Sequence, residues 1–251
     1  MSGHSKWSTI KRKKGKADAE RGRIFTRLIK EIAVAARHGG GDPEANPRLR
    51  TAINSAKAAN MPASNIERAI KKGTGDLPGA TYEENTYEGY GQAGVAIFLE
   101  VLTDNKNRTT AEIRHLFSKY GGNLGENGCV AWLFDPKGVV TIPKDGVDED
   151  QLFEVAIDAG AEDVNTESDD AFVVFTATSD LEKVADAIEA AGIPVQAREY
   201  DKIPQNNVHV NEEQAVKLMR LLEMLEDHDD VQKVYSNPDI DPDVAEKLSN
   251  A

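Results

Sequence analysis

The stretch that decides the fold is residues 139–199, VVTIPKDGVDEDQLFEVAIDAGAEDVNTESDDAFVVFTATSDLEKVADAIEAAGIPVQARE. Short apolar runs alternate here with two longer segments whose apolar residues recur at helical spacing. The expected order is strand 139–142, helix 148–159, strands 163–166 and 172–176, helix 180–191 and strand 194–199. Gly160 and Gly192 stand just past the two helices, where glycine commonly ends a helix. The order β-α-β-β-α-β predicts a ferredoxin-like α+β domain.

The segments on either side of this stretch predict a second domain of the same kind. Strand 95–102, helix 107–120 and strand 130–134 precede it, and strand 208–210, helix 212–225 and strand 231–235 follow it. Joined, they repeat the order β-α-β-β-α-β, which predicts one ferredoxin-like domain inserted into another, between its second and third strands. Residues 74–94, rich in Gly, Tyr and Glu, are interpreted as a linker.

The first 75 residues predict a small all-α domain behind a basic arm. Residues 1–21 hold few large apolar side chains, so they are interpreted as a mobile arm that cannot offset its own ordering entropy. A helix is expected over 17–37, a second from the Asn46-Pro47 pair to the residues before Pro62, and a third from the capping box Ser64–Glu67 to Gly73. The predicted organisation is an α+β multidomain chain: arm 1–21, helical domain 22–75, split ferredoxin-like domain 76–135 and 203–238, inserted ferredoxin-like domain 136–202, and polar tail 239–251.

Charge divides the chain of 251 residues into two unlike parts. Residues 1–80 contain 17 Lys/Arg and 7 Asp/Glu, a net charge of +10, whereas the rest contains 13 and 36, a net charge of −23. Such asymmetry indicates a polyanion-binding end on an acidic body. The lone Cys129, and the lack of a long apolar run or an apolar leader, predict a cytoplasmic protein without disulfides or a membrane partner.

Signals for enzymes, cofactors and metals are weak. The run Gly89-Tyr-Gly91-Gln-Ala-Gly94 matches GxGxxG, but it precedes a strand instead of following one, so a flexible linker is preferred to a dinucleotide site. The five histidines lack ligand spacing, and Cys129 is interpreted as a small buried apolar residue. The acidic cluster 226–230 is interpreted as a solvated turn in preference to a cation site, because its spacing is not that of a calcium loop. We expect no catalytic residues, cofactor, metal or small-molecule substrate.

The basic end is the candidate site. Phosphate backbones are bound by clustered Lys and Arg side chains, which fix position without reading sequence. Trp7 either stacks on an unpaired base or packs on the helical domain, and the sequence does not choose between them. Arg37, Arg48, Arg50, Lys57, Arg68, Lys71 and Lys72 lie nearby in the chain. The predicted nucleic-acid-binding residues are Lys6, Trp7, Lys11, Arg12, Lys13, Lys14, Lys16, Arg21, Arg23, Arg27 and Lys30.

Several motifs along the chain resemble those of one family. They include Met1-Ser-Gly-His-Ser-Lys-Trp7, Asn46-Pro-Arg-Leu-Arg50, Asn60-Met-Pro62, Tyr87-Glu-Gly-Tyr-Gly91 and Asp104-Asn-Lys-Asn-Arg-Thr109. On these residues the chain resembles the YebC/PmpR family over essentially its whole length. The resemblance implies a helical N-terminal domain followed by two α+β domains, in a protein that is not an enzyme.

The resemblance implies two different roles in gene expression. One is a DNA-binding transcriptional regulator. The other is a ribosome-associated translation factor that binds rRNA or tRNA and relieves stalling on proline runs, as a mitochondrial relative that activates translation of a cytochrome oxidase subunit suggests. A protein-interaction adaptor without nucleic-acid contact is a third alternative. The expected partners are duplex DNA or ribosomal RNA, and the expected state is a monomer, since no heptad pattern calls for a dimer.

Overall fold

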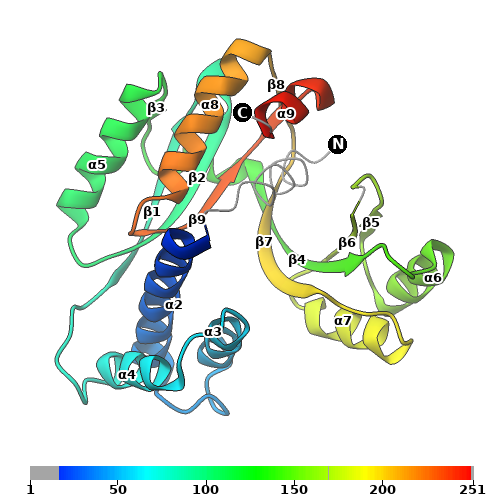
Figure 1. Ribbon diagram of the computed structural model, residues 1–251, viewed down its shortest axis with the longest axis horizontal. Helices are drawn as coiled ribbons and strands as arrows, with labels where there is room; N and C mark the ends of the chain where they lie inside the picture. Colours follow the sequence, from blue (N-terminus) through cyan, green and yellow to red (C-terminus); the bar gives the residue numbers. More distant parts are fainter. Residues whose placement is uncertain (1–16, 169, 250–251) are drawn as a thin grey trace.

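The structure, a computed structural model, describes residues 17–168 and 170–249. It consists of a helical unit (residues 17–75), a central unit (82–133 and 205–249) and an inserted unit (134–204), as Figure 1 shows. An all-helical segment followed by two separate antiparallel sheets, each covered by helices, confirms the expected multidomain α+β fold. Within the described residues, no helix is both long enough and apolar enough to cross a bilayer.

Three helices build the helical unit: α2 (Ala17–Gly39), α3 (Pro47–Ala58) and α4 (Ala63–Thr74). Asn46 caps α3, as the Asn46-Pro47 pair predicts, because its side-chain oxygen accepts a hydrogen bond from the Leu49 amide at 3.1 Å. Its side-chain nitrogen donates to the carbonyls of Ala35 and Gly40 at 2.8 and 2.9 Å. The residue that starts α3 therefore also ties it to the end of α2.

The third helix departs from its prediction at both ends. It begins at Ala63, directly after Pro62, and no side chain caps it, so the expected capping box at Ser64 is wrong. Gly73 lies inside the helix, where an added Cβ would come within 2.3 Å of the Ala33 carbonyl oxygen. Gly73 thus permits α4 to approach α2 closely, and the helix ends instead at Gly75, whose φ is +87°.

The central unit is a four-stranded antiparallel sheet in the order β3-β1-β2-β9. Its elements are β1 (Glu83–Tyr90), β2 (Ala96–Thr103), α5 (Lys106–Lys119), β3 (Asn123–Leu124), α8 (Glu212–Glu226) and β9 (Val231–Ser236). One face of β2, including Leu99, packs against Phe117 of α5 and Leu218 of α8 in the largest core of the chain. Both helices therefore cover the same face of this sheet.

The predicted linker 74–94 is wrong over its second half, because Glu83–Tyr90 forms β1 in the middle of the sheet. The Gly and Glu residues that suggested a linker have structural roles in β1, because they contact distant parts of the chain. An added Cβ at Gly89 would come within 2.7 Å of the Phe117 ring and 2.5 Å of the Asn123 carbonyl oxygen. Glu88 is only 3% exposed, yet its carboxylate accepts three backbone hydrogen bonds from the loop before residue 132.

Replacing Glu88 by alanine should lower the free energy of unfolding by about 2–3 kcal/mol. The variant leaves the amides of Gly128, Val130 and Ala131 buried or half-buried without their acceptor, which lies 2.6–2.8 Å away in the native protein. Urea unfolding measures the change. The exposed Glu126 of the same loop, replaced by alanine, is the matched control. A loss at Glu88 no larger than at Glu126 would contradict this role.

The inserted unit has the ferredoxin-like topology that residues 139–199 predict. Its elements are β4 (Phe134–Pro143), α6 (Glu149–Ala159), β5 (Asp163–Asn165), β6 (Ala171–Thr176), α7 (Leu181–Ala190) and β7 (Ala197–Pro204). The strands lie in the order β5-β6-β4-β7 and every neighbouring pair is antiparallel. Both helices pack on one face, with Leu152 and Ile188 fully buried between sheet and helices.

Two smaller expectations for the strands of the central unit are wrong. The predicted strand 130–134 is a 3₁₀ turn, η2 (Ala131–Leu133), that leads into β4. The predicted strand 208–210 exists as β8 (Val208–Val210), but it pairs in parallel with β10 (Pro238–Ile240) instead of joining the main sheet. The neighbours of β2 in that sheet are β1 and β9. The predicted polar tail contains β10 and α9 (Pro242–Ser249), which packs on α8.

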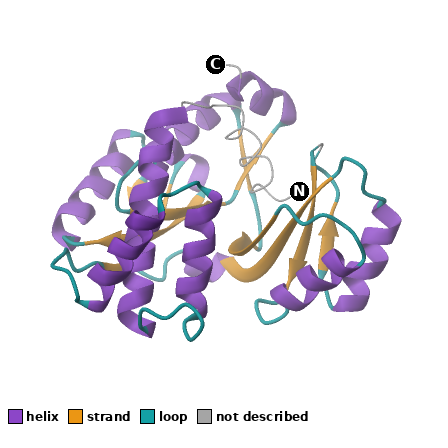
Figure 2. Ribbon diagram, turned by 60° about the horizontal axis from the view of Figure 1, so that its bottom comes forward, coloured by secondary structure: helices purple, strands orange, loops and turns teal. Residues whose placement is uncertain are grey.

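An aromatic cluster joins the inserted unit to the free face of the central sheet. The rings of Phe98, Phe134 and Tyr235 lie with their centroids 6.0–6.5 Å apart. Above them, the Lys202 ammonium of β7 pairs with Glu100 of β2 at 2.7 Å. Figure 2 shows the sheet of the inserted unit with its two helices on the side away from the rest of the molecule.

Candidate nucleic-acid interface

The structure describes only part of the predicted nucleic-acid-binding set. The following predicted residues lie outside the described residues: Lys6, Trp7, Lys11, Arg12, Lys13, Lys14 and Lys16. Arg21 falls within α2, but its side chain is outside the described part. Arg23, Arg27 and Lys30 are described, and they occupy one stripe of α2 because they are four and three residues apart.

This stripe of α2 faces the acidic cluster of the α8–β9 turn, residues 226–230, which we call the acidic turn. Arg23 Nη2 lies 3.1 Å from Asp227 Oδ1, and each of these side chains is a little over one-third exposed. Lys30 Nζ lies 2.6 Å from Asp230 Oδ1 and donates to the Asp229 carbonyl at 2.9 Å. Lys30 is 6% exposed, so its ammonium is not part of an accessible basic surface.

Asp230 is the centre of the contact between the helical and central units. Its carboxylate accepts hydrogen bonds from Lys30, Arg108 and Thr109 at 2.6, 2.8 and 2.7 Å, and from Thr103 at 3.1 Å. Burial alone would raise the pKa of this carboxyl, but these donors outweigh it and hold the pKa well below its usual range. Asp230 is therefore ionised and joins α2, β2 and α5 at one point.

A possible cation site beside Asp230 has its ligand atoms engaged. Glu112, His228 and Asp230 bring two carboxylate oxygens and a ring nitrogen within 4.8 Å of one another. His228 Nδ1 accepts from the Asp230 amide at 3.1 Å, so Nε2 carries the proton and donates to Glu112 at 3.0 Å. The Asp230 carboxylate already neutralises Lys30 and Arg108. Within the described residues, the positive charges that this cluster pairs with are therefore those of the protein's own lysine and arginine side chains.

A groove of about 810 Å³ runs along the same contact. Its lining includes Thr26, Tyr82, Arg108, His115, Met224 and Asp229. The groove holds charges of both signs in close pairs, since Arg108 bonds both Asp104 and Asp230. This mixture does not favour an anion over a cation.

Other faces of the helical unit carry cations that are exposed. Arg48 is engaged, because it bonds Glu31 of α2 at 2.7 Å and also Glu84 of β1. The remaining exposed cations of this unit form no ion pair with another described residue: Arg37, Arg50, Lys57, Arg68, Lys71 and Lys72. Arg50 and Lys57 share a face of α3, and Arg68, Lys71 and Lys72 share a face of α4. We call these six residues the exposed basic set.

Sequence reasoning placed most weight on the arm and on α2, and within α2 the structure shows Lys30 buried and Arg23 paired with Asp227. The exposed basic set was noted as nearby but was not predicted as the site. Its signal was present in the helical spacing, since Lys71 and Lys72 follow Arg68 by three and four residues on α4. A second missed feature is Trp132, which is 64% exposed while its indole N–H donates to the Cys129 carbonyl at 3.2 Å.

Two family models match almost the whole chain. One, described as the N-terminal domain of TACO1/YebC proteins, matches residues 5–76, and another, described as the second and third domain of TACO1/YebC, matches residues 82–238. The chain belongs to the TACO1/YebC family. The resemblance seen in the sequence motifs is thereby confirmed.

Relatives in this family are similar over their full length. One from Desulfosudis oleivorans is 59% identical over 246 residues, which cover 98% of this chain and 100% of that protein. One from Sulfurihydrogenibium sp. is 59% identical over 249 residues, 99% of each chain. Both are named "Probable transcriptional regulatory protein".

A solved structure from Aquifex aeolicus, titled as that of a conserved hypothetical protein, Aq1575, shares the fold. It is 49% identical to this TACO1/YebC chain, with a TM-score of 0.81, and the match covers 89% of this chain and 92% of that one. The fold of this chain is therefore shared with that protein.

Proposed function

We propose that this chain is a nucleic-acid-binding regulator of gene expression, and more specifically a DNA-binding transcriptional regulator without catalytic activity. The observation that carries the proposal is the exposed basic set: six cations on the helical unit that have no ion-pair partner among the described residues. Next to them in the chain are the six lysines and arginines of residues 1–16. Together they provide a surface that phosphate oxygens would neutralise.

The distribution of acidic residues also favours binding of a polyanion at the helical unit. The segment 136–202 contains 17 Asp/Glu and 5 Lys/Arg, a net charge of −12. A polyanion would be repelled by this part of the molecule and attracted by the helical unit. In Figure 1 the helices of the inserted unit, α6 and α7, lie at the opposite side of the molecule from α4.

The names of the relatives from Desulfosudis oleivorans and Sulfurihydrogenibium favour a role in transcription. Lys and Arg contacts to phosphate bind DNA and RNA alike, so the test must include both. The RNA result decides between the transcriptional role and the ribosome-associated alternative.

The test is fluorescence anisotropy of the full chain with a labelled DNA duplex and a labelled RNA hairpin, each of about 20 base pairs, over a salt series. If about six phosphates are neutralised, affinity should fall roughly a thousandfold between about 50 and 200 mM salt. Preference for the duplex DNA supports transcriptional regulation, and preference for the RNA hairpin supports the translational alternative. Binding of neither probe would contradict the proposal.

A further inference from the structure

The ion pairs between α2 and the acidic turn become more buried from the rim of the contact to its interior. At the rim, the Arg23–Asp227 pair is half-exposed, and such pairs contribute little net stability because water and salt screen them. In the interior, the side chains of Lys30 and Asp230 are 8% and 4% exposed, and Asp230 has three further side-chain donors. The interior pair therefore holds α2 in place even when the rim pair opens.

Arg27 lies between these two pairs and is incompletely bonded. Its Nε is buried and has no hydrogen-bond partner among the described residues. Burial lowers the pKa of its guanidinium, while Glu226, Asp227 and Asp229 of the acidic turn act in the opposite direction. Because this Nε is buried, a ligand from solvent does not reach it, and Arg27 contributes positive charge on the same stripe of α2 as Arg23.

We propose that the acidic turn regulates nucleic-acid binding by competing with it: Asp227 occupies Arg23 in the free protein, and a phosphate group of the nucleic acid displaces that carboxylate. The phosphate oxygens would then accept from Arg23 Nη2, whose side chain is already partly exposed. Lys30 stays with Asp230, so the helix remains docked. This inference rests on the proposed function and deepens it.

The chemistry of the two acceptors makes the exchange inexpensive. A carboxylate and a phosphate both present paired oxygens to a guanidinium, so Arg23 exchanges one charge-assisted bond for another. The carboxylate of Asp227 becomes exposed to water when it is released, and it is already more than one-third exposed. The acidic turn thus lowers the affinity for isolated phosphates and favours a polyanion that also contacts the exposed basic set.

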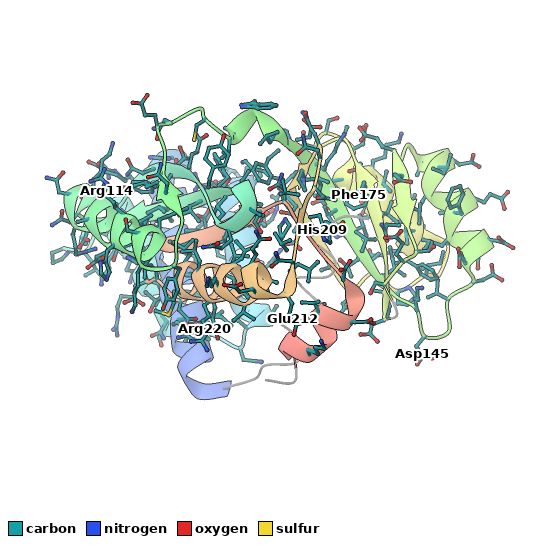
Figure 3. The ribbon with its side chains drawn as sticks, turned by 90° about the horizontal axis from the view of Figure 1, so that it is seen from above. Arg114, Asp145, Phe175, His209, Glu212 and Arg220 are labelled. Atoms are coloured by element: carbon teal, nitrogen blue, oxygen red, sulfur yellow. The ribbon has the colours of Figure 1, made fainter. Side chains whose placement is uncertain are left out.

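The test compares Asp227→Asn with Asp145→Asn in the full chain. Both variants remove one negative charge from an exposed or half-exposed side chain. Figure 3 places Asp145 in the inserted unit, at the side of the molecule opposite Arg114 of α5. The probes are the labelled DNA duplex and RNA hairpin named above, at about 50 mM salt, where ion pairs are weakly screened.

We expect Asp227→Asn to bind the preferred probe about two- to fivefold more tightly than Asp145→Asn, the range that a half-exposed ion pair allows. In an Arg23→Gln background the two variants should bind equally, because the competing pair is already gone. Equal affinities in the native background, with salt-sensitive binding retained, would overturn this inference and leave the proposed function standing. Loss of binding to both probes by the native protein would overturn both.

Discussion

Replacing Asp230 by alanine is expected to lower the free energy of unfolding by about 3–5 kcal/mol, because the variant leaves a buried charge without its partner. Lys30 Nζ keeps only the carbonyls of Asp229 and Leu102, at 2.9 and 3.5 Å. Thr103 and Thr109 lose an acceptor in the same site. Urea unfolding of the variant and the native protein measures the difference.

Two companion variants separate the ion pair from general damage to the turn. Asp229→Ala removes a neighbouring exposed carboxylate and should change stability by less than about 0.5 kcal/mol, as surface substitutions do. Adding Lys30→Met to Asp230→Ala should recover part of the loss, because no buried ammonium then remains unpaired. If Asp230→Ala were no more destabilising than Asp229→Ala, Asp230 would not be the anchor between the units.

The same carboxylate predicts a pH dependence of stability. Its folded-state pKa lies below the unfolded value of about 3.9, so its contribution is present above that pH and is lost as the pH falls toward the folded pKa. The difference in stability between the native protein and Asp230→Ala should therefore be constant near neutrality and shrink below about pH 4. A difference that grows on acidification would have the wrong sign.

The second large effect concerns nucleic-acid binding. Replacing Arg68, Lys71 and Lys72 together by glutamine should weaken binding at least tenfold at about 0.1 M salt, since each phosphate contact contributes roughly eightfold there. All three side chains are exposed on one face of α4 and bond no acidic residue in the described chain, so the fold should be unaffected. Anisotropy with the preferred probe measures the loss.

The matched control removes three exposed cations from α5: Lys106, Arg114 and Lys119. Its net charge equals that of the α4 variant, so a difference between them reports position and not total charge. We expect the α5 variant to bind within about threefold of the native protein, because its cations lie outside the helical unit and only long-range attraction is lost. Equal weakening by the two variants would mean that net charge alone governs binding.

Residues 139–199 could be predicted well because each element there is decided locally. Apolar residues at helical spacing place Leu152 and Ile188 in the core, and Gly160 ends α6 in the left-handed conformation with φ of +107°. Asp148 caps that helix through the Gln151 amide at 2.9 Å. Periodicity and caps are short-range signals, and the sequence contains them directly.

β1 could not be predicted because its Glu and Gly residues are explained by contacts with residues far along the chain. Glu88 is buried on account of amides some 40 residues later, and Gly89 is required by the ring of Phe117. The positions of β8 and β3 were missed for the same reason, since strand pairing is a tertiary choice. The domain boundaries expected from the sequence stay a prediction.

The candidate site divides along the same line. A count of charges identified the basic end of the chain, but it did not distinguish cations that are exposed to solvent from cations that are paired with carboxylates. Arg23 and Lys30 face the acidic turn some 200 residues away, whereas Lys71 and Lys72 face solvent. The acidic cluster and the basic helix were both noticed, and only the fold shows that they are partners.

The central claim is that the exposed basic set contacts phosphate. The most direct measurement is the slope of log Kd against log salt concentration for the native protein and for the variant with Arg68, Lys71 and Lys72 replaced by glutamine. Each lost phosphate contact should reduce the slope by about 0.9 on duplex DNA, so the account predicts a decrease of about 2 to 3. Equal slopes for the two proteins would contradict it.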